Sequence, residues 1–117
     1  MIIIKARRWF DRTYGNTYHS VQVFDDAKLI GEIPFEYGYG DSYIQTAFEI
    51  LSAAGYYPYK KTDAQKDIYS KTGKYLYSTP IESLNKQEAY YNFKDDMRNH
   101  RDRFLVFVDD VARKKDL

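Results

Sequence analysis

Residues 2–24 read IIIKARRWFDRTYGNTYHSVQVF, which is two runs of β-branched and aromatic residues separated by Tyr14-Gly15-Asn16. Such runs favour β-strands, and glycine and asparagine accept the positive φ of a tight turn. The pattern predicts a β-hairpin with strands over residues 2–13 and 17–24.

A third strand is expected directly after this hairpin. Asp25-Asp26-Ala27-Lys28 has the composition of a turn, and the apolar residues from Leu29 to Phe35 follow it. Pro34 cannot donate a backbone hydrogen bond, so it restricts this strand to a sheet edge or to a strand end. We therefore expect an N-terminal three-stranded antiparallel meander.

Residues 42–55 predict an amphipathic helix. Ser42 and Gln45 have the spacing of a capping box, and Gly55 is a typical C-terminal stop. The apolar residues that recur with helical spacing are Tyr43, Ile44, Ala47, Phe48, Leu51 and Ala54. Because the start, the period and the stop agree, we expect this helix to cover one face of the sheet.

The second half of the chain predicts two further helices and a strand. A short helix is expected near residues 63–72, and a longer one over residues 80–100, with a break and a restart at Asn85, capped with Glu88, as the alternative. The continuous apolar run over residues 104–108 predicts a C-terminal strand buried on both faces. The sequence thus predicts an α+β fold in which an antiparallel sheet packs against at least two helices.

Composition narrows the class of protein. The chain has 117 residues, which predicts a single domain over residues 1–117, and its net charge of +1 neither requires nor excludes a polyanionic partner. It has no cysteine, which excludes disulfides and thiolate zinc sites. Without a signal peptide or a membrane-length apolar stretch, we expect a cytoplasmic location. Neither histidine has a metal-binding spacing, so we expect no metal. The sequence shows no catalytic signature either, and we expect no cofactor and no catalytic residue.

The predicted hairpin separates core positions from a candidate binding face. If Tyr14 pairs with Thr17, one face carries Ile4, Ala6, Phe10, Val21 and Val23. The other face carries cations and flat rings, namely Lys5, Arg7, Trp9, Tyr18, Ser20, Gln22 and Phe24. Such a mixture stacks on bases or anchors a protein partner. The alternatives are that a second helix covers this face, or that a one-residue bulge near Arg8 inverts the assignment.

The loop Tyr37-Gly38-Tyr39-Gly40-Asp41 precedes the predicted helix start. Backbone amides at such a position can hold an anion, but Asp41 would repel a phosphate, so a structural strand-to-helix turn is the alternative. With the strand face, this loop completes the predicted partner-binding set of Arg7, Trp9, Tyr18, Tyr37, Tyr39 and Asp41.

Two further surfaces are candidates. Arg12 and His19 are expected opposite one another near the hairpin tip, as a polar cluster or, alternatively, as an acid-base pair. A second basic surface consists of Lys60, Lys61, Lys66, Lys71 and Lys74, which tyrosines interrupt. This pattern suits nucleic acid, although a solvated helix explains it equally well.

Three segments of the first half carry a resemblance to known proteins. Arg7-Arg8-Trp9-Phe10, residues 15–21 and residues 37–47 resemble segments of small uncharacterised proteins from bacteriophage and prophage genomes. The resemblance implies an accessory protein that acts inside an infected bacterium, in host takeover or counter-defence. It implies no activity and no catalytic residues.

The favoured hypothesis is a protein that binds or sequesters a bacterial target, either a protein or a small nucleotide. One alternative is a nucleic-acid-binding module that uses the basic and aromatic surfaces. A second alternative is a small nucleotide-processing enzyme that uses His19, Arg12 and a tyrosine. Tyrosine-rich patches also allow a homo-oligomer, and no membrane partner is expected.

Overall fold

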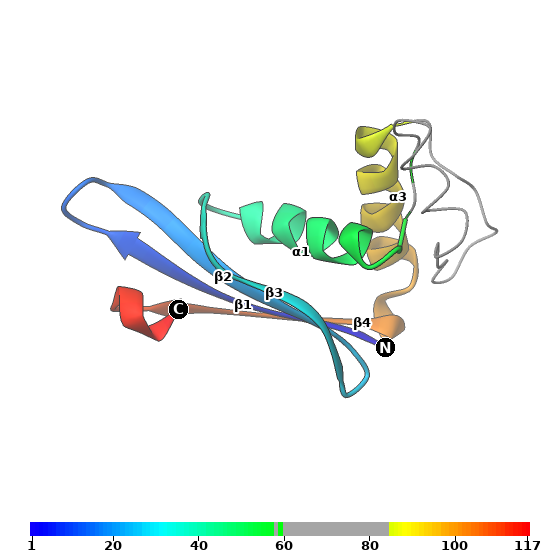
Figure 1. Ribbon diagram of the computed structural model, residues 1–117, viewed down its shortest axis with the longest axis horizontal. Coiled ribbons are helices and arrows are strands. Elements are labelled where there is room, and N and C mark those ends of the chain that lie inside the picture. The colour runs from blue at the N-terminus through cyan, green and yellow to red at the C-terminus, as the bar shows by residue number, and fades with distance from the viewer. Residues whose placement is uncertain (58, 60–84) are drawn as a thin grey trace.

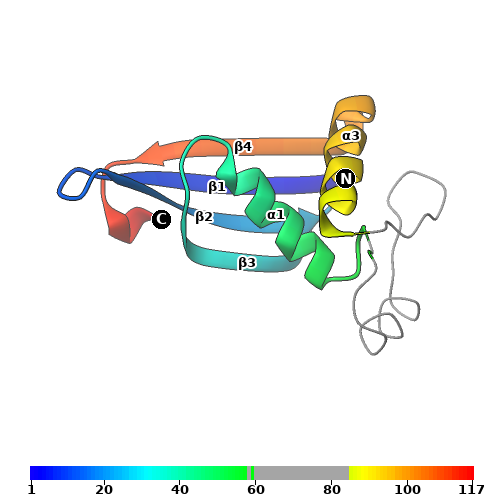
Figure 2. The same ribbon diagram turned by 90° about the horizontal axis from the view of Figure 1, so that it is seen from above.

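A computed structural model describes residues 1–57, 59 and 85–117. Within this part of the chain, four strands form one sheet in the order β3-β2-β1-β4, and two helices pack on one of its faces (Figure 1, Figure 2). The strands are β1 (Ile2–Asp11), β2 (Asn16–Asp25), β3 (Lys28–Tyr37) and β4 (Phe104–Val111), and the helices are α1 (Ser42–Ala53) and α3 (Lys86–Asn99). The α+β class and the antiparallel meander of β1, β2 and β3 are confirmed.

The hairpin turn is longer than predicted. Asp11 pairs with Asn16, so residues 12–15 form a four-residue loop. The Asp11 carbonyl accepts a 2.8 Å hydrogen bond from the amide of Gly15, which has a φ of 71°, and the Asp11 carboxylate accepts one from the amide of Thr13. The predicted pairing of Tyr14 with Thr17 is therefore wrong. The true register differs from it by an even number of positions, so every strand residue keeps its predicted face and no bulge inverts β1.

Helix α1 covers the predicted core face of the sheet except at its hairpin end, where Phe10 is 54% exposed. Phe48 and Leu51 are fully buried against the β1 and β2 side chains, and Gly55, with a φ of 93°, follows the end of the helix as predicted. The predicted capping box at the start does not form. Asp41 takes the N-cap position, and the Ser42 hydroxyl donates a 2.8 Å hydrogen bond to the Tyr39 carbonyl instead.

Helix α3 packs beside α1 on the same side of the sheet (Figure 1). The Phe93 and Phe48 ring centroids are 5.9 Å apart, and both side chains are fully buried. The predicted restart at Asn85 is confirmed, because Asn85 is the N-cap of α3 and its side chain accepts a hydrogen bond from the amide of Glu88. Residues 80–84 of the predicted longer helix and the predicted short helix near residues 63–72 lie outside the described residues.

The two edge strands differ from one another. Among the strands that the structure describes, β3 pairs only with β2, in agreement with the edge position that Pro34 predicts. β4 lies at the opposite edge and runs parallel to β1, so the sheet is mixed rather than wholly antiparallel. The predicted burial of β4 on both faces is wrong, because its residues from Leu105 to Asp110 are exposed.

Candidate functional site

Four aromatic rings meet on the sheet face that α1 and α3 leave open. The Tyr18 ring centroid lies 5.8 Å from that of Trp9 and 4.6 Å from that of Phe35, and both contacts are stacked. Tyr37, which pairs with Tyr18 across the strands, makes an edge contact at 5.7 Å. Phe35 and Tyr37 are 43% and 59% exposed. Trp9 and Tyr18 are half-buried. These four residues, called the ring cluster below, leave part of their apolar ring surface open to solvent.

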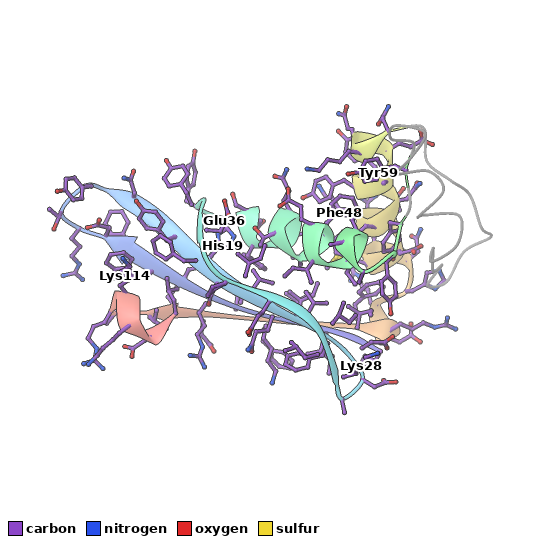
Figure 3. All side chains as sticks on the ribbon, in the orientation of Figure 1. His19, Lys28, Glu36, Phe48, Tyr59 and Lys114 are labelled. Carbon is purple, nitrogen blue, oxygen red and sulfur yellow. The ribbon has the colours of Figure 1, made fainter. Side chains whose placement is uncertain are left out.

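The C-terminal turn η2 (Lys114–Asp116) lies on the same side of the sheet (Figure 1). The Lys114 ammonium is 4.9 Å from the Phe35 ring centroid (Figure 3). The Arg7 guanidinium donates a 3.0 Å hydrogen bond to the Asp116 carbonyl. The turn therefore places cations at the border of the ring cluster.

A hollow of about 570 Å³ adjoins the ring cluster on this face. Its polar side chains are Lys5, Arg7, Ser20, Gln22, Glu32 and Asp109, and Phe107 adds a ring. The Gln22 amide donates to the Glu32 carboxylate at 3.0 Å, and the Lys5 ammonium lies over the Phe24 ring. Two cations and two carboxylates line the hollow, so its side-chain charges balance.

The described α-helices do not cover the Trp9 face. Both α1 and α3 lie on the opposite side of the sheet (Figure 1), whereas the predicted short helix near residues 63–72 lies outside the described residues. Arg7, Trp9 and Tyr18 lie on this face, as predicted. Tyr37, which was expected in the loop before the helix, is the last residue of β3 and joins them there. Tyr39 and Asp41 do not join them. They lie in the loop that leads to α1, and no ring contact connects Tyr39 to the cluster within the described part of the chain.

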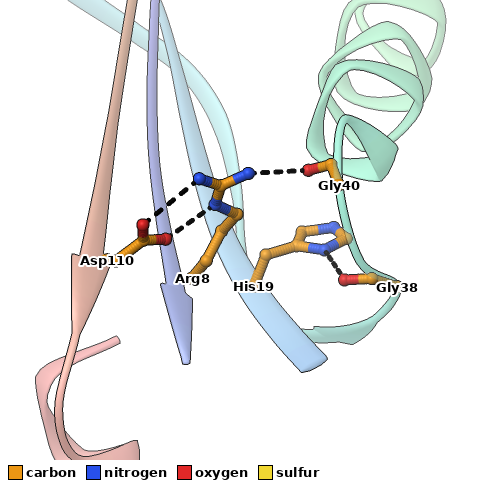
Figure 4. A network of polar contacts seen from close by, with 5 residues as sticks. All are labelled: Arg8, His19, Gly38, Gly40 and Asp110. Carbon is orange, nitrogen blue, oxygen red and sulfur yellow. Dashed lines mark hydrogen bonds and ion pairs between the residues drawn. The ribbon is translucent and has the colours of Figure 1, made fainter. Parts of the chain in front are cut away.

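A second polar site lies on the helix side of the sheet (Figure 4). The Arg8 guanidinium donates to both Asp110 carboxylate oxygens, at 2.8 and 3.3 Å, and to the Gly40 carbonyl at 3.1 Å. The hydrogen bond with Asp110 raises the pKa of Arg8 above its ordinary value. Arg8 thus ties β1 both to β4 and to the loop before α1.

His19 lies beside Arg8 and is 1% exposed. Its Nδ1 is 3.2 Å from the Gly38 carbonyl oxygen, which can only accept, so Nδ1 carries the proton. Its Nε2 is 2.7 Å from the Thr46 hydroxyl. Gly38 has no room for a side chain, since an added Cβ would lie 2.7 Å from the Ser42 Cβ and 3.3 Å from the His19 ring. His19 therefore fixes the path of this loop.

This geometry corrects the predicted pair of Arg12 and His19. Arg8 is the residue opposite His19, and Arg12 lies exposed in the four-residue hairpin loop. Both His19 ring nitrogens are engaged and the ring is shielded from solvent. The alternative of an acid-base pair of Arg12 with His19 is therefore wrong, and the polar cluster that forms contains Arg8 in place of Arg12.

Several other sequence expectations concern features outside this face. Lys60, Lys61, Lys66, Lys71 and Lys74 lie outside the described residues. Over the residues that are described, no group of three or more histidine, aspartate or glutamate side chains is arranged to hold a metal ion. No helix in the same residues is long and apolar enough to cross a membrane.

Comparisons of the chain with protein-family models, with curated proteins and with solved structures found no match.

Sequence reasoning missed three participants in these sites. Phe35 was assigned only to a strand, although its spacing of two residues from Tyr37 places both rings on one face. Lys114 follows β4 in a charged segment that carries no pattern. Asp110 is separated from Arg8 by 102 residues, and only the parallel pairing of β1 with β4 brings them together.

Proposed function

We propose that this chain is a small binding protein that recognises a protein partner through the ring cluster. The observation that carries the proposal is a cluster of four rings, with Phe35 and Tyr37 exposed and Trp9 and Tyr18 half-buried, on the sheet face that α1 and α3 leave open. Aromatic side chains offer large contact areas at a small cost in conformational entropy, and they dominate the energetics of protein interfaces.

The charges around the ring cluster favour a protein over a polyanion. Nucleic-acid surfaces need an excess of cations to neutralise phosphates. Here Glu32 and Asp109 balance Lys5 and Arg7 in the hollow, and a guanidinium hydrogen bond of Arg7 already goes to the C-terminal turn. A surface with rings, amides and both signs of charge matches the mixed chemistry of another protein.

A small nucleotide is the second candidate ligand, and the hollow favours it. Its volume of about 570 Å³ lies within the range of small-molecule sites. The Lys5 and Arg7 side chains would face the phosphates, and the Phe107 ring offers a surface on which a base can stack. The carboxylates of Glu32 and Asp109 would repel the phosphates of such a ligand. We therefore favour a protein partner over a nucleotide.

The cellular setting of the proposal comes from the resemblance to bacteriophage proteins. The Arg7 to Phe10 segment and residues 15–21 carry that resemblance, and they form part of the face that holds the ring cluster. We therefore place the partner in the cytoplasm of an infected bacterium, where sequestering it would serve host takeover or counter-defence.

The test is capture of a partner from bacterial lysate by the tagged chain, with and without nuclease, followed by an affinity measurement on the purified pair. Replacing Tyr37 with alanine removes an exposed ring of the cluster and should weaken binding roughly 30-fold or more, as for other aromatic hot spots. Tyr14→Ala is the matched control, because Tyr14 is 79% exposed at the hairpin turn, away from the cluster.

The outcomes separate the candidates. A partner that binds wild type and Tyr14→Ala equally but loses Tyr37→Ala supports recognition through the ring cluster. Equal binding by all three chains would contradict it. If the eluate instead holds a nucleotide whose binding is lost in Lys5→Ala, the hollow is the site. Capture that nuclease or moderate salt abolishes would assign nucleic acid as the partner.

A further inference from the structure

The strand β4 forms an outer edge of the sheet (Figure 2). It pairs with β1 on one side, and within the described residues no strand pairs with its other side. An edge strand presents a row of backbone donors and acceptors that another strand can bind. The eight residues of β4 are long enough to hold such a strand.

The side chains of β4 are apolar and exposed on both faces of the sheet. Leu105 and Phe107 are 41% and 51% exposed on the open face, and Val106 and Val108 are 38% and 37% exposed on the helix face. A continuous apolar run of this kind is typical of an interior strand with neighbours on both sides. The composition of β4 therefore fits an interior strand better than its edge position in one copy of the chain.

The opposite edge is built differently. β3 contains Pro34 and Gly31, carries Lys28, Glu32 and Glu36, and has two irregularities in its pairing with β2. Proline, charges and bulges are the features by which proteins prevent edge-to-edge association. The apolar half of β4 has none of them, so the two edges of one sheet contrast in this respect.

We propose that a second copy of this chain pairs with β4, so that two antiparallel β4 strands join two sheets into one of eight strands. A two-fold axis that relates antiparallel strands in one sheet is perpendicular to it, so one residue must pair with itself. With Val106 at the axis, Leu105 pairs with Phe107 of the second copy. Phe104 then pairs with Val108.

Charge selects this register. With Val106 at the axis, the strand pairing ends at Phe104 and Val108, so Arg103, the last residue of the 3-10 turn before β4, comes near Asp109 of the second copy, and the symmetry produces this contact twice. A register centred on Phe107 would instead oppose Leu105 to Asp109, which places an apolar side chain against a carboxylate. The Val106 register therefore pairs apolar with apolar residues and a cation with an anion.

The cysteine-free sequence permits a direct test. In the proposed register the two Val106 Cα atoms are about 4.5–5.5 Å apart, within the range that a disulfide spans. Val106→Cys should therefore oxidise to a covalent dimer at least roughly tenfold faster than Leu29→Cys, which places a similarly exposed cysteine on β3. Equal rates for the two variants would overturn the proposal.

Sedimentation of the unmodified chain gives an independent test. The pairing of one strand covers less than the about 800 Å² per subunit of a typical stable interface, so dissociation on the order of micromolar is expected. Val106→Lys should shift the protein to a monomer, whereas Leu29→Lys should leave dimerisation unchanged. A wild-type monomer at all concentrations up to roughly millimolar, or equal loss in both variants, would refute the pairing.

Exchange of charges tests the register itself. Arg103→Asp and Asp109→Arg should each weaken the dimer, because each opposes like charges across the axis. The double variant restores opposite charges and should recover most of the wild-type affinity. No recovery, with folding confirmed by circular dichroism, would contradict the Val106 register.

Discussion

Removing the central ring of the cluster should reveal how strongly its rings stabilise one another. Tyr18 contacts three rings, and its closest contact is with Phe35 at 4.6 Å with an interplanar angle of 17°. An aromatic pair contributes about 0.5–1.5 kcal/mol beyond the area that it buries. We therefore expect a coupling free energy of about 1 kcal/mol between Tyr18→Ala and Phe35→Ala in a double-mutant cycle.

The assay is urea unfolding of the wild type, the two single variants and the double variant. The chain has one tryptophan, and its ring stacks on Tyr18, so Trp9 fluorescence reports on the cluster while circular dichroism reports on the whole fold. Leu29→Ala gives the control cycle, because Leu29 is on the same strand as Phe35 but pairs with Phe24, far along β2 from Tyr18. Its coupling with Tyr18→Ala should be zero within about 0.5 kcal/mol.

The reasoning would be refuted if Tyr18 coupled no more strongly to Phe35 than to Leu29. The rings would then lie side by side without stabilising one another. Such rings would not be held in a fixed arrangement before binding, and the entropic advantage argued for the ring cluster would be lost.

Two further perturbations test the core. Gly31→Ala should cost about 1–3 kcal/mol of unfolding free energy, because the added Cβ would lie 2.8 Å from the Ile50 Cγ2. The cost should largely disappear in an Ile50→Ala background, and an equal cost in both backgrounds would exclude this contact as the cause. Burial raises the pKa of Tyr43 above its ordinary value of 10.0. The phenol therefore ionises at a lower pH in the unfolded chain than in the folded one. The contribution of Tyr43 to the unfolding free energy is unchanged below pH 10.0 and falls as the pH rises above it. Tyr43→Phe should reduce this fall by up to about 1.4 kcal/mol per pH unit, as measured by urea unfolding at several alkaline pH values. An unchanged slope would contradict this assignment.

The parts of the fold that follow from local patterns were predictable. Residues 42–55 combine helical spacing with a glycine stop, and both signals act within one element. The faces of the hairpin were also correct although its loop length was wrong, because side chains alternate with a period of two and the register error was even. Loop length was harder to predict because the Asp11 side chain stabilises a longer turn that competes with the two-residue one.

Contacts between distant segments were not predictable in this way. The position of Arg8 on the predicted apolar face suggested a bulge, and the predicted polar partner of His19 was Arg12. The actual partners of Arg8 and His19 are the Gly38 and Gly40 carbonyls and the Asp110 carboxylate, which chain topology brings there. Sequence shows that a polar residue needs a partner on such a face, whereas the partner depends on the tertiary structure.

The strand β4 connects the two proposals. Its apolar run correctly predicted a strand, but a run of residues does not specify what covers them, and one copy of the chain leaves them exposed. A two-fold axis perpendicular to the sheet keeps the open faces of both copies on the same side. The pairing proposed for β4 would therefore present two ring clusters in the same direction. A partner with two matching sites would then bind more tightly than either cluster alone allows, because the second contact forms at a high effective concentration.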